Sequence, residues 1–234
     1  MSNFYYNYDK VTKRIHPEWM PFFETNKHEL VDILAKLNEL TEKSTIYPHR
    51  QDIFRAFYYH SPKDIKLTII AQDPYINEDN NKPQAMGLCF SVPKCHRLIP
   101  PSLQNIRKEI KNCYPDYQIP KHGLLKKWAK REKMLLLNSA LTVNKGISNS
   151  HAKLWNKFTD KIIDWFSEQN QHCVFLLMGG YALQKVVHID LSRHRIFSTV
   201  HPSPLSAHNG FFGCGVFKKI DDHLEERNIE KIKW

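Results

Sequence analysis

The sequence of 234 residues lacks the cysteine patterns that metal centres and disulfide frameworks require. Its five cysteines are odd in number and widely scattered, with neither a C-x-x-C pair nor a Cys/His zinc spacing among them. A zinc ribbon and a four-cysteine iron–sulfur cluster are therefore excluded. Reduced thiols are the expectation, and Cys173, which lies in an apolar run, is predicted to belong to the core.

Long hydrophobic runs are also missing. No apolar stretch approaches the roughly 18 residues that a transmembrane helix needs, so we expect no membrane association. Residues 1–10 contain aromatic and polar side chains but not the apolar centre of a secretory signal. With no targeting segment, an intracellular location in the nucleus or the cytoplasm is favoured. We expect residues 1–18 to form an N-terminal arm that is loosely held over residues 1–10. Residues 19–234 are expected to form one domain, because no repeat or Gly/Ser linker interrupts them.

The features that are abundant indicate a folded protein with an anionic partner. A hydrophobic content of 41%, with 12% aromatic residues, excludes a disordered chain. The formal net charge of +10 favours a nucleic acid or another polyanion. Most of this charge comes from lysine, whose abundance can equally reflect an A·T-rich genome. Charge alone therefore leaves the partner open.

Four short apolar runs, rich in leucine or β-branched residues, are typical of buried strands. They cover residues 65–70, 135–137, 174–178 and 196–200. The segments between them show helical periodicity, for example Leu103, Ile106 and Ile110 after a Pro-Pro-Ser helix start. Strands that alternate with long helices pair in parallel through right-handed crossovers. We therefore predict an α/β fold: a single domain with a central, twisted, four-stranded parallel sheet flanked by helices on both faces.

Each predicted strand ends in a chemically unusual segment. These segments are Gln72-Asp73-Pro74-Tyr75, Asn138, Gly179-Gly180 and His201-Pro202-Ser203. Taken singly, each has an ordinary explanation as a turn, a cap or a hydrogen-bonded structural residue. The carboxyl ends of parallel strands share one edge of the sheet, where open α/β folds bind ligands. The coincidence of four such segments therefore predicts a site at that edge.

Two of these motifs, Gln72-Asp73-Pro74-Tyr75 and the segment that begins at His201, resemble those of family 1 uracil-DNA glycosylases. Shorter matching fragments occur in order between Trp19 and Phe217. They include Ile46-Tyr47-Pro48, Gly87-Leu88-Cys89-Phe90-Ser91-Val92, Pro100-Pro101-Ser102-Leu103-Gln104-Asn105, Leu135-Leu136-Leu137-Asn138 and Phe158-Thr159-Asp160. The resemblance implies a monomeric hydrolase of base excision repair. It would cut the N-glycosidic bond of deoxyuridine in single- and double-stranded DNA, with no metal and no cofactor. Residues 19–234 would then be the catalytic domain.

The resemblance assigns recognition of the base to four residues. Uracil inside a duplex is out of reach, so the nucleotide must be flipped out and read along its hydrogen-bonding edge. Asn138 would donate to uracil O4 and accept from N3–H, a pairing that cytosine reverses. Phe90 would stack on the base, although without the resemblance it reads as a core phenylalanine. Tyr75 would lie against C5 and reject the methyl group of thymine, and Gln72 would complete the pocket through its backbone.

Two further residues carry the reaction in this interpretation. Cleavage creates an oxocarbenium-like sugar and a uracil anion. The resemblance places Asp73 where it stabilises the cation and orients the attacking water. It places His201 where a neutral imidazole donates a hydrogen bond to uracil O2. No lysine in these motifs suits Schiff-base chemistry, so no covalent intermediate is expected.

Loops rich in Pro and Ser are expected to hold the DNA. Pro101 and Ser102 start one such loop, and Ser203 and Ser206 lie in another; hydroxyl and backbone N–H groups there would bind phosphates. Leu205 resembles the wedge that fills the space left by the flipped base. Taken alone, this loop is also compatible with an ordinary rigid turn that carries an exposed leucine.

The chain departs from the family pattern near the site. Ala71 replaces a glycine and Ile76 replaces a histidine. Gly180 replaces a serine that would touch phosphate, so this position would offer the DNA only its backbone.

The sequence offers two alternatives to this interpretation. A mismatch-specific thymine/uracil glycosylase carries Asn at the position of Asp73 and lacks the gate at Tyr75, so the sequence disfavours it. A DNA-binding accessory subunit of replication, with weak or secondary glycosylase activity on the same fold, stays open because the two roles can coexist. Replication or repair partners are not identifiable from the sequence.

Overall fold

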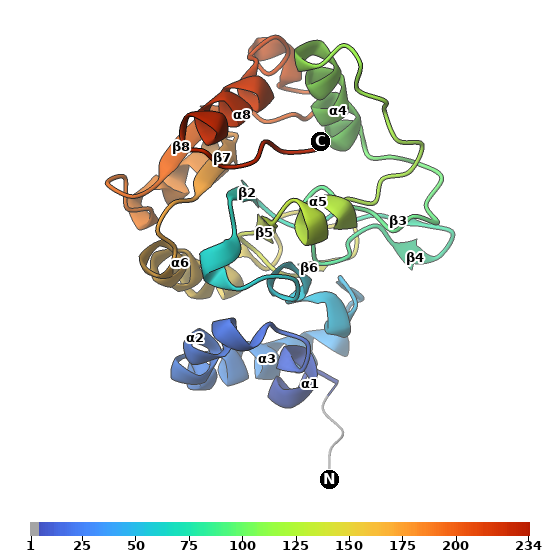
Figure 1. Cartoon of the computed structure of the whole chain (residues 1–234). Helices are drawn as coiled ribbons and strands as arrows, with labels where there is room; N and C mark the ends of the chain where they lie inside the picture. Colours follow the sequence, from blue (N-terminus) through green and yellow to red (C-terminus); the bar gives the residue numbers. More distant parts are fainter. Residues whose placement is uncertain (1–4) are drawn as a thin grey trace.

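The computed structural model describes residues 5–234, and a four-stranded parallel sheet lies at its centre (Figure 1). The strands are β2 (Leu67–Ala71), β5 (Met134–Asn138), β7 (Val174–Met178) and β8 (Arg195–Thr199), in the order β5-β2-β7-β8. Every residue of β2, β5 and β7 is buried, whereas β8 lies at an edge and is partly exposed. Such continuous apolar strands require cover on both faces of the sheet. The predicted α/β architecture is confirmed.

Helices supply this cover on both faces. In the view of Figure 1, α6 (Ala152–Gln169) lies below the sheet with α2 (Met20–Thr25) and α3 (Lys27–Thr41), while α4 (Pro101–Cys113) and α8 (Val216–Glu226) lie above it. Leu103, Ile106 and Ile110 form the buried face of α4, as their spacing predicts. The other α-helices are α1 (Tyr8–Thr12), α5 (Lys126–Arg131) and α7 (Gly180–Leu183). Six 3₁₀ segments complete the described helices: η1 (Pro17–Trp19), η2 (Arg50–Asp52), η3 (Arg55–Phe57), η4 (Pro62–Asp64), η5 (Gln184–His188) and η6 (Ala207–Asn209).

Aromatic side chains join η1 and α2 to α6 in the core. The ring of Trp19 stacks on Phe166 at 5.5 Å between centroids, and Phe22 meets Phe158 edge-on at the same separation. Large buried rings contribute strongly to core stability through their area. Cys173 is fully buried, which confirms its predicted place in the core. Among residues 5–234, no helix combines the length and the apolar character that crossing a bilayer demands.

Two small antiparallel strand pairs are not predicted by the sequence. β1 (Ile46–Tyr47) pairs with β6 (Val143–Asn144), and β3 (Glu78–Asp79) pairs with β4 (Lys82–Pro83). Between β3 and β4, Asn80 and Asn81 both adopt positive φ, as a two-residue hairpin turn requires. Strands of two residues are too short to show an alternating pattern, so periodicity cannot reveal them.

The expectation of a loosely held segment over residues 1–10 is wrong for residues 5–10. Tyr6 is only 2% exposed and exchanges two backbone–side-chain hydrogen bonds of 2.8 Å with Asn38 of α3. The hydroxyl of Tyr8 donates to Glu24 at 2.9 Å. Aromatic rings gain free energy by leaving water, so this segment packs onto the domain. Residues 1–4 lie outside the described part of the chain, and the division after residue 18 stays a prediction.

Candidate active site

A cavity of about 460 Å³ lies at the carboxyl edge of the sheet. This volume is typical of small-ligand sites. The structure brings most of the predicted site residues together around it: Gln72, Asp73, Tyr75, Phe90, Ser102, Asn138, His201, Ser203 and Leu205. Pro101, Gly180 and Ser206 do not line the cavity. No group of three or more His, Cys, Asp or Glu side chains that could hold a metal ion occurs within residues 5–234.

Asp73 follows β2 by two residues, and its carboxylate is held from one side. Oδ2 accepts hydrogen bonds from the Ser148 hydroxyl at 2.8 Å and from the Asn149 backbone N–H at 2.6 Å. Asn149 adopts φ 62°, which turns its N–H toward the carboxylate at the entry to α6. Ser148 and Asn149 are not among the site residues predicted from the sequence. The only sequence feature that could have indicated them is the polar run that precedes the helical pattern of α6.

His201 follows β8 by two residues, and its hydrogen bonds define its tautomer. The backbone N–H of Ser203 donates to Nδ1 at 3.0 Å, so the proton of the neutral ring is on Nε2. Burial lowers the pKa of His201, and the charge of Asp73 opposes this shift. The site therefore holds a neutral imidazole whose Nε2–H is a hydrogen-bond donor.

The turn after β7 gives His201 its place. Gly179 adopts φ 92°, and a Cβ built on it would lie 2.9 Å from the Cβ of His201. Only glycine fits this conformation and this contact. The neighbouring Gly180 differs, since a Cβ built there meets no atom within 4 Å and its φ lies outside the left-handed region. Gly179 is thus required by packing, whereas Gly180 is not.

Asn138 ends β5 with its amide at the cavity. Asn138 pairs with Ala71 in the parallel β2–β5 ladder, and the backbone N–H of Ser139 donates to the Ala71 carbonyl at 2.9 Å. Asn138 is 6% exposed, and its Oδ1 is buried without a hydrogen-bond partner among residues 5–234. Buried polar atoms are normally paired, so an orphaned acceptor that faces a cavity indicates a ligand donor.

Phe90 and Tyr75 form the apolar wall. Phe90 adopts φ 59°, a left-handed conformation that is unusual for a bulky residue and typical of functional sites. The Tyr75 hydroxyl donates to the Phe90 carbonyl at 3.3 Å, and burial raises the pKa of Tyr75. Gly87, just before Phe90, packs against the backbone of Asp52 and so supports this wall. A Cβ at Gly87 would lie 1.7 Å from the Asp52 carbonyl oxygen, so only glycine fits there.

The loop after His201 carries the predicted DNA-binding residues. The Ser203 and Ser206 hydroxyls lie 2.8 Å apart, and the Ser206 hydroxyl donates to the His201 carbonyl at 2.8 Å. Leu205 at the tip is 94% exposed, so it makes almost no packing contact within the protein. Ser102, which also lines the cavity, lies in the first turn of α4, next to the exposed Pro101.

The fold and this cavity are typical of an α/β enzyme with a small-ligand site at the carboxyl edge of its sheet. An orphaned amide acceptor and an aromatic wall suit a planar ring, and a carboxylate beside a neutral imidazole suits cleavage of a bond to it. Comparison with known proteins agrees. Residues 57–225 match the uracil DNA glycosylase superfamily. The chain is 47% identical to the uracil-DNA glycosylase of Haemophilus influenzae over 191 residues, 81% of this chain and 84% of that protein.

Two further comparisons support the same assignment. The uracil-DNA glycosylase of Photorhabdus laumondii is 45% identical over 213 residues, which cover 90% of this chain and 92% of that protein. The crystal structure of mimivirus uracil-DNA glycosylase superposes with a TM-score of 0.90 at 29% identity, covering 98% of this chain and 90% of that one. The chain therefore belongs to the uracil-DNA glycosylase family, and it is an enzyme of base excision repair.

Proposed function

We propose that the chain flips uracil out of single- and double-stranded DNA and hydrolyses its N-glycosidic bond, as a monomer and without metal. The observation that carries the proposal is the buried, unpaired Oδ1 of Asn138 at a cavity that Asp73 and His201 also line. An unmet buried acceptor costs free energy, and the N3–H of a flipped uracil is the donor it lacks. Because the substrate is DNA, we place the enzyme in the cytoplasm or the nucleus.

Recognition follows from the amide and the apolar wall. With Oδ1 accepting from N3–H, the NH₂ group of Asn138 donates to uracil O4. Cytosine presents an acceptor at N3 and a donor at C4, so both contacts would fail and buried groups would stay unpaired. Phe90 stacks on the ring. Tyr75, which its hydrogen bond to Phe90 holds in place, occupies the space that a thymine methyl would need.

Bond cleavage uses the two groups on either side of the base. Asp73, oriented through Oδ2 by Ser148 and Asn149, stabilises the positive charge on the sugar and orients the attacking water. The Nε2–H of His201 donates to uracil O2 as negative charge develops there. A preorganised donor of this kind needs no proton transfer to stabilise the transition state.

The surrounding loops bind the DNA backbone. Hydroxyl groups for the phosphates come from Ser102, Ser203 and Ser206. Backbone N–H groups come from Gly180 and from the turn that begins at Pro101. Leu205, which is free of internal packing, enters the stack and fills the space of the flipped base. The net charge of +10 adds attraction that does not depend on sequence.

The test is release of free uracil from oligonucleotides in the presence of a metal chelator. Asp73→Asn and His201→Leu are each expected to lower the rate by about 10²–10⁴, the usual scale for such groups. Asp116→Asn and His28→Leu are the matched controls, because both side chains are exposed and distant in the chain from every cavity residue. Turnover at the wild-type level in either cavity variant would refute the assignment.

A further inference from the structure

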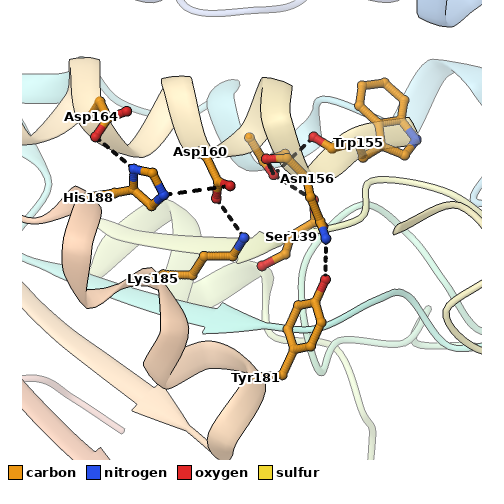
Figure 2. A network of polar contacts seen from close by, with 9 residues as sticks. Ser139, Trp155, Asn156, Asp160, Asp164, Tyr181, Lys185 and His188 are labelled. Atoms are coloured by element: carbon orange, nitrogen blue, oxygen red, sulfur yellow. Dashed lines mark hydrogen bonds and ion pairs between the residues drawn. The ribbon is translucent and has the colours of Figure 1, made fainter. Parts of the chain in front are cut away.

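A second group of polar side chains lies outside the cavity, between α6 and the segment that follows β7. Three side chains at four-residue spacing share one face of α6, and Figure 2 shows three others pointing toward them from the facing segment. The contacts are Asn156 Nδ2 to Tyr181 Oη (2.6 Å), Lys185 Nζ to Asp160 Oδ1 (2.6 Å) and His188 Nδ1 to Asp164 Oδ1 (2.9 Å). We call these six residues the α6–α7 zipper.

The burial of this segment is unusual, because its lysine is buried while two of its apolar side chains are exposed. Lys185 is 5% exposed, whereas Val187 is 82% and Leu183 is 48% exposed. Well-packed apolar residues in place of a buried ion pair are often equally stable or more stable, so stability alone is a weak reason for this arrangement. Ala182 and Val186 of the segment also pack into the core, but apolar contacts have no direction. A hydrogen-bonded ion pair instead specifies one register between the two elements.

On one side of the zipper, α6 supports the cavity. Ser148 and Asn149, which hold Asp73, lead directly into its first turn. Thr159 donates to the Ser139 carbonyl at 2.7 Å, one residue after Asn138. The helix that carries Asp160 is therefore the frame on which the catalytic carboxylate and the base-reading amide are placed.

On the other side, the zipper holds the turn assigned to a DNA phosphate. α7 (Gly180–Leu183) continues without a break into η5 (Gln184–His188), so the position of Lys185 determines the position of Gly180. Lys185 Nζ also lies 5.7 Å from the ring centre of Tyr181, the residue next to Gly180. Because Gly180 has no side chain that could adjust, its contact with DNA depends entirely on where its backbone lies.

We propose that Asp160 and Lys185 are positioning residues for DNA: their ion pair holds the Gly180 backbone where it meets a phosphate, relative to the frame of α6. The inference rests on the proposed function, which includes that phosphate contact. Gly179, which packs against His201, is fixed to β8 by the hydrogen bond of its N–H to the Thr199 carbonyl at 2.8 Å. His201 itself is held by Ser203 and Ser206 of its own loop, so the ion pair acts on Gly180 rather than on His201. Loss of the ion pair therefore weakens DNA binding and leaves bond cleavage nearly unchanged.

The test compares two double variants of the whole chain on uracil-containing duplex. Asp160→Leu/Lys185→Met removes both charges, so that neither is left unpaired. We expect KM to rise about tenfold, the scale of one lost hydrogen bond to a charged group, with kcat within about twofold. The unfolding temperature is expected to stay within about 3 °C of wild type. Glu29→Leu/Lys161→Met is the matched control: it removes the ion pair between α3 and α6, one residue along the same helix. Its KM is expected to equal that of the wild type.

The conservative variant Asp160→Glu keeps the charge and is expected to bring KM back to within about threefold of wild type. An unchanged KM in Asp160→Leu/Lys185→Met overturns the inference. So does a joint loss of kcat, DNA affinity and thermal stability, because the pair would then be merely structural. If that variant does not fold, the Kd of Asp160→Asn for duplex decides, and a wild-type Kd overturns the inference. The two proposals can fail separately. Absence of uracil release by the wild type would refute the proposed function, whereas the Kd of the variants for duplex DNA would still test the α6–α7 zipper.

Discussion

Replacing Gly180 by serine adds one hydroxyl group where the chain offers only backbone to the DNA. The structure predicts no strain from this change. A Cβ at Gly180 has open space around it, and the left-handed φ of this turn belongs to Gly179. The unfolding temperature is therefore expected to stay the same, so any change in DNA binding reports on the hydroxyl itself.

The expected gain is smaller than that of a full hydrogen bond to a charged group. Such a bond contributes about 1.5–3 kcal/mol net. Gly180 is exposed, so water competes for the phosphate and the new side chain gives up rotamer freedom. About 0.8–1.4 kcal/mol remains, which corresponds to roughly four- to tenfold tighter binding of DNA by Gly180→Ser.

The assay is a binding titration of duplex DNA across a salt series. Serine adds no charge and releases no counterion, so the salt dependence should shift in level but keep its slope. Gly180→Ala is the matched control, since it adds the Cβ without the hydroxyl, and it should bind like the wild type. Equal affinity of Gly180→Ser and Gly180→Ala would refute the reasoning. Weaker binding together with lower thermal stability would show that the turn itself needs glycine.

A pH profile and changes at three cavity and loop residues test the rest of the site. Burial lowers the pKa of His201 below its ordinary 6.5; kcat/KM should therefore stay level from neutral pH down to 6.5 and fall only below it, and a decline that begins above 6.5 would contradict the neutral imidazole. Asn138→Asp should release cytosine, because a carboxylate accepts from the cytosine amino group, and Tyr75→Ala should release thymine, because the methyl group gains room. Analysis of the released bases checks both, and release of uracil alone by both variants would mean that the pocket is wrongly assigned. Leu205→Ala should slow excision from duplex more than from single strands, because only a duplex must be unstacked; equal rate losses would make Leu205 a packing residue.

The sheet and the long helices could be predicted from the sequence because burial imposes a pattern on them. β2, β5 and β7 coincide with apolar runs, since strands covered on both faces must be apolar. β8 overlaps the fourth run although it lies at an edge and is only partly buried. The packed segment around Tyr6 could not be predicted in the same way. Its fit depends on Asn38, which lies on a helix far along the chain, and short aromatic-polar sequences carry no period that reveals such contacts.

The same distinction holds within the site. Asp73, Asn138 and His201 could be predicted because all three lie at or just beyond carboxyl ends of parallel strands. Ser148 and Asn149 could not, because only the folded chain brings them to Asp73. The burial of Lys185 is the opposite of what its charge suggests, and it depends on Asp160 of another element.

Two features of the cavity cost free energy of folding, and both contact the base in the proposed mechanism. The left-handed conformation of Phe90 costs about 1–3 kcal/mol, and the unpaired Oδ1 of Asn138 costs a similar amount, about 1–3 kcal/mol. Together they are a large fraction of the roughly 5–15 kcal/mol that stabilises a typical domain. The scaffold holds both in place: Cys89 N–H donates to the Leu136 carbonyl beside Phe90, and the β2–β5 ladder fixes Asn138. A flipped uracil therefore meets a ring and an acceptor that are already oriented. When the N3–H of uracil pairs with Oδ1, the free-energy cost of the unpaired acceptor is removed, whereas cytosine has no donor at N3 and leaves that cost in place. Selectivity for uracil therefore arises from the folded protein before DNA is bound.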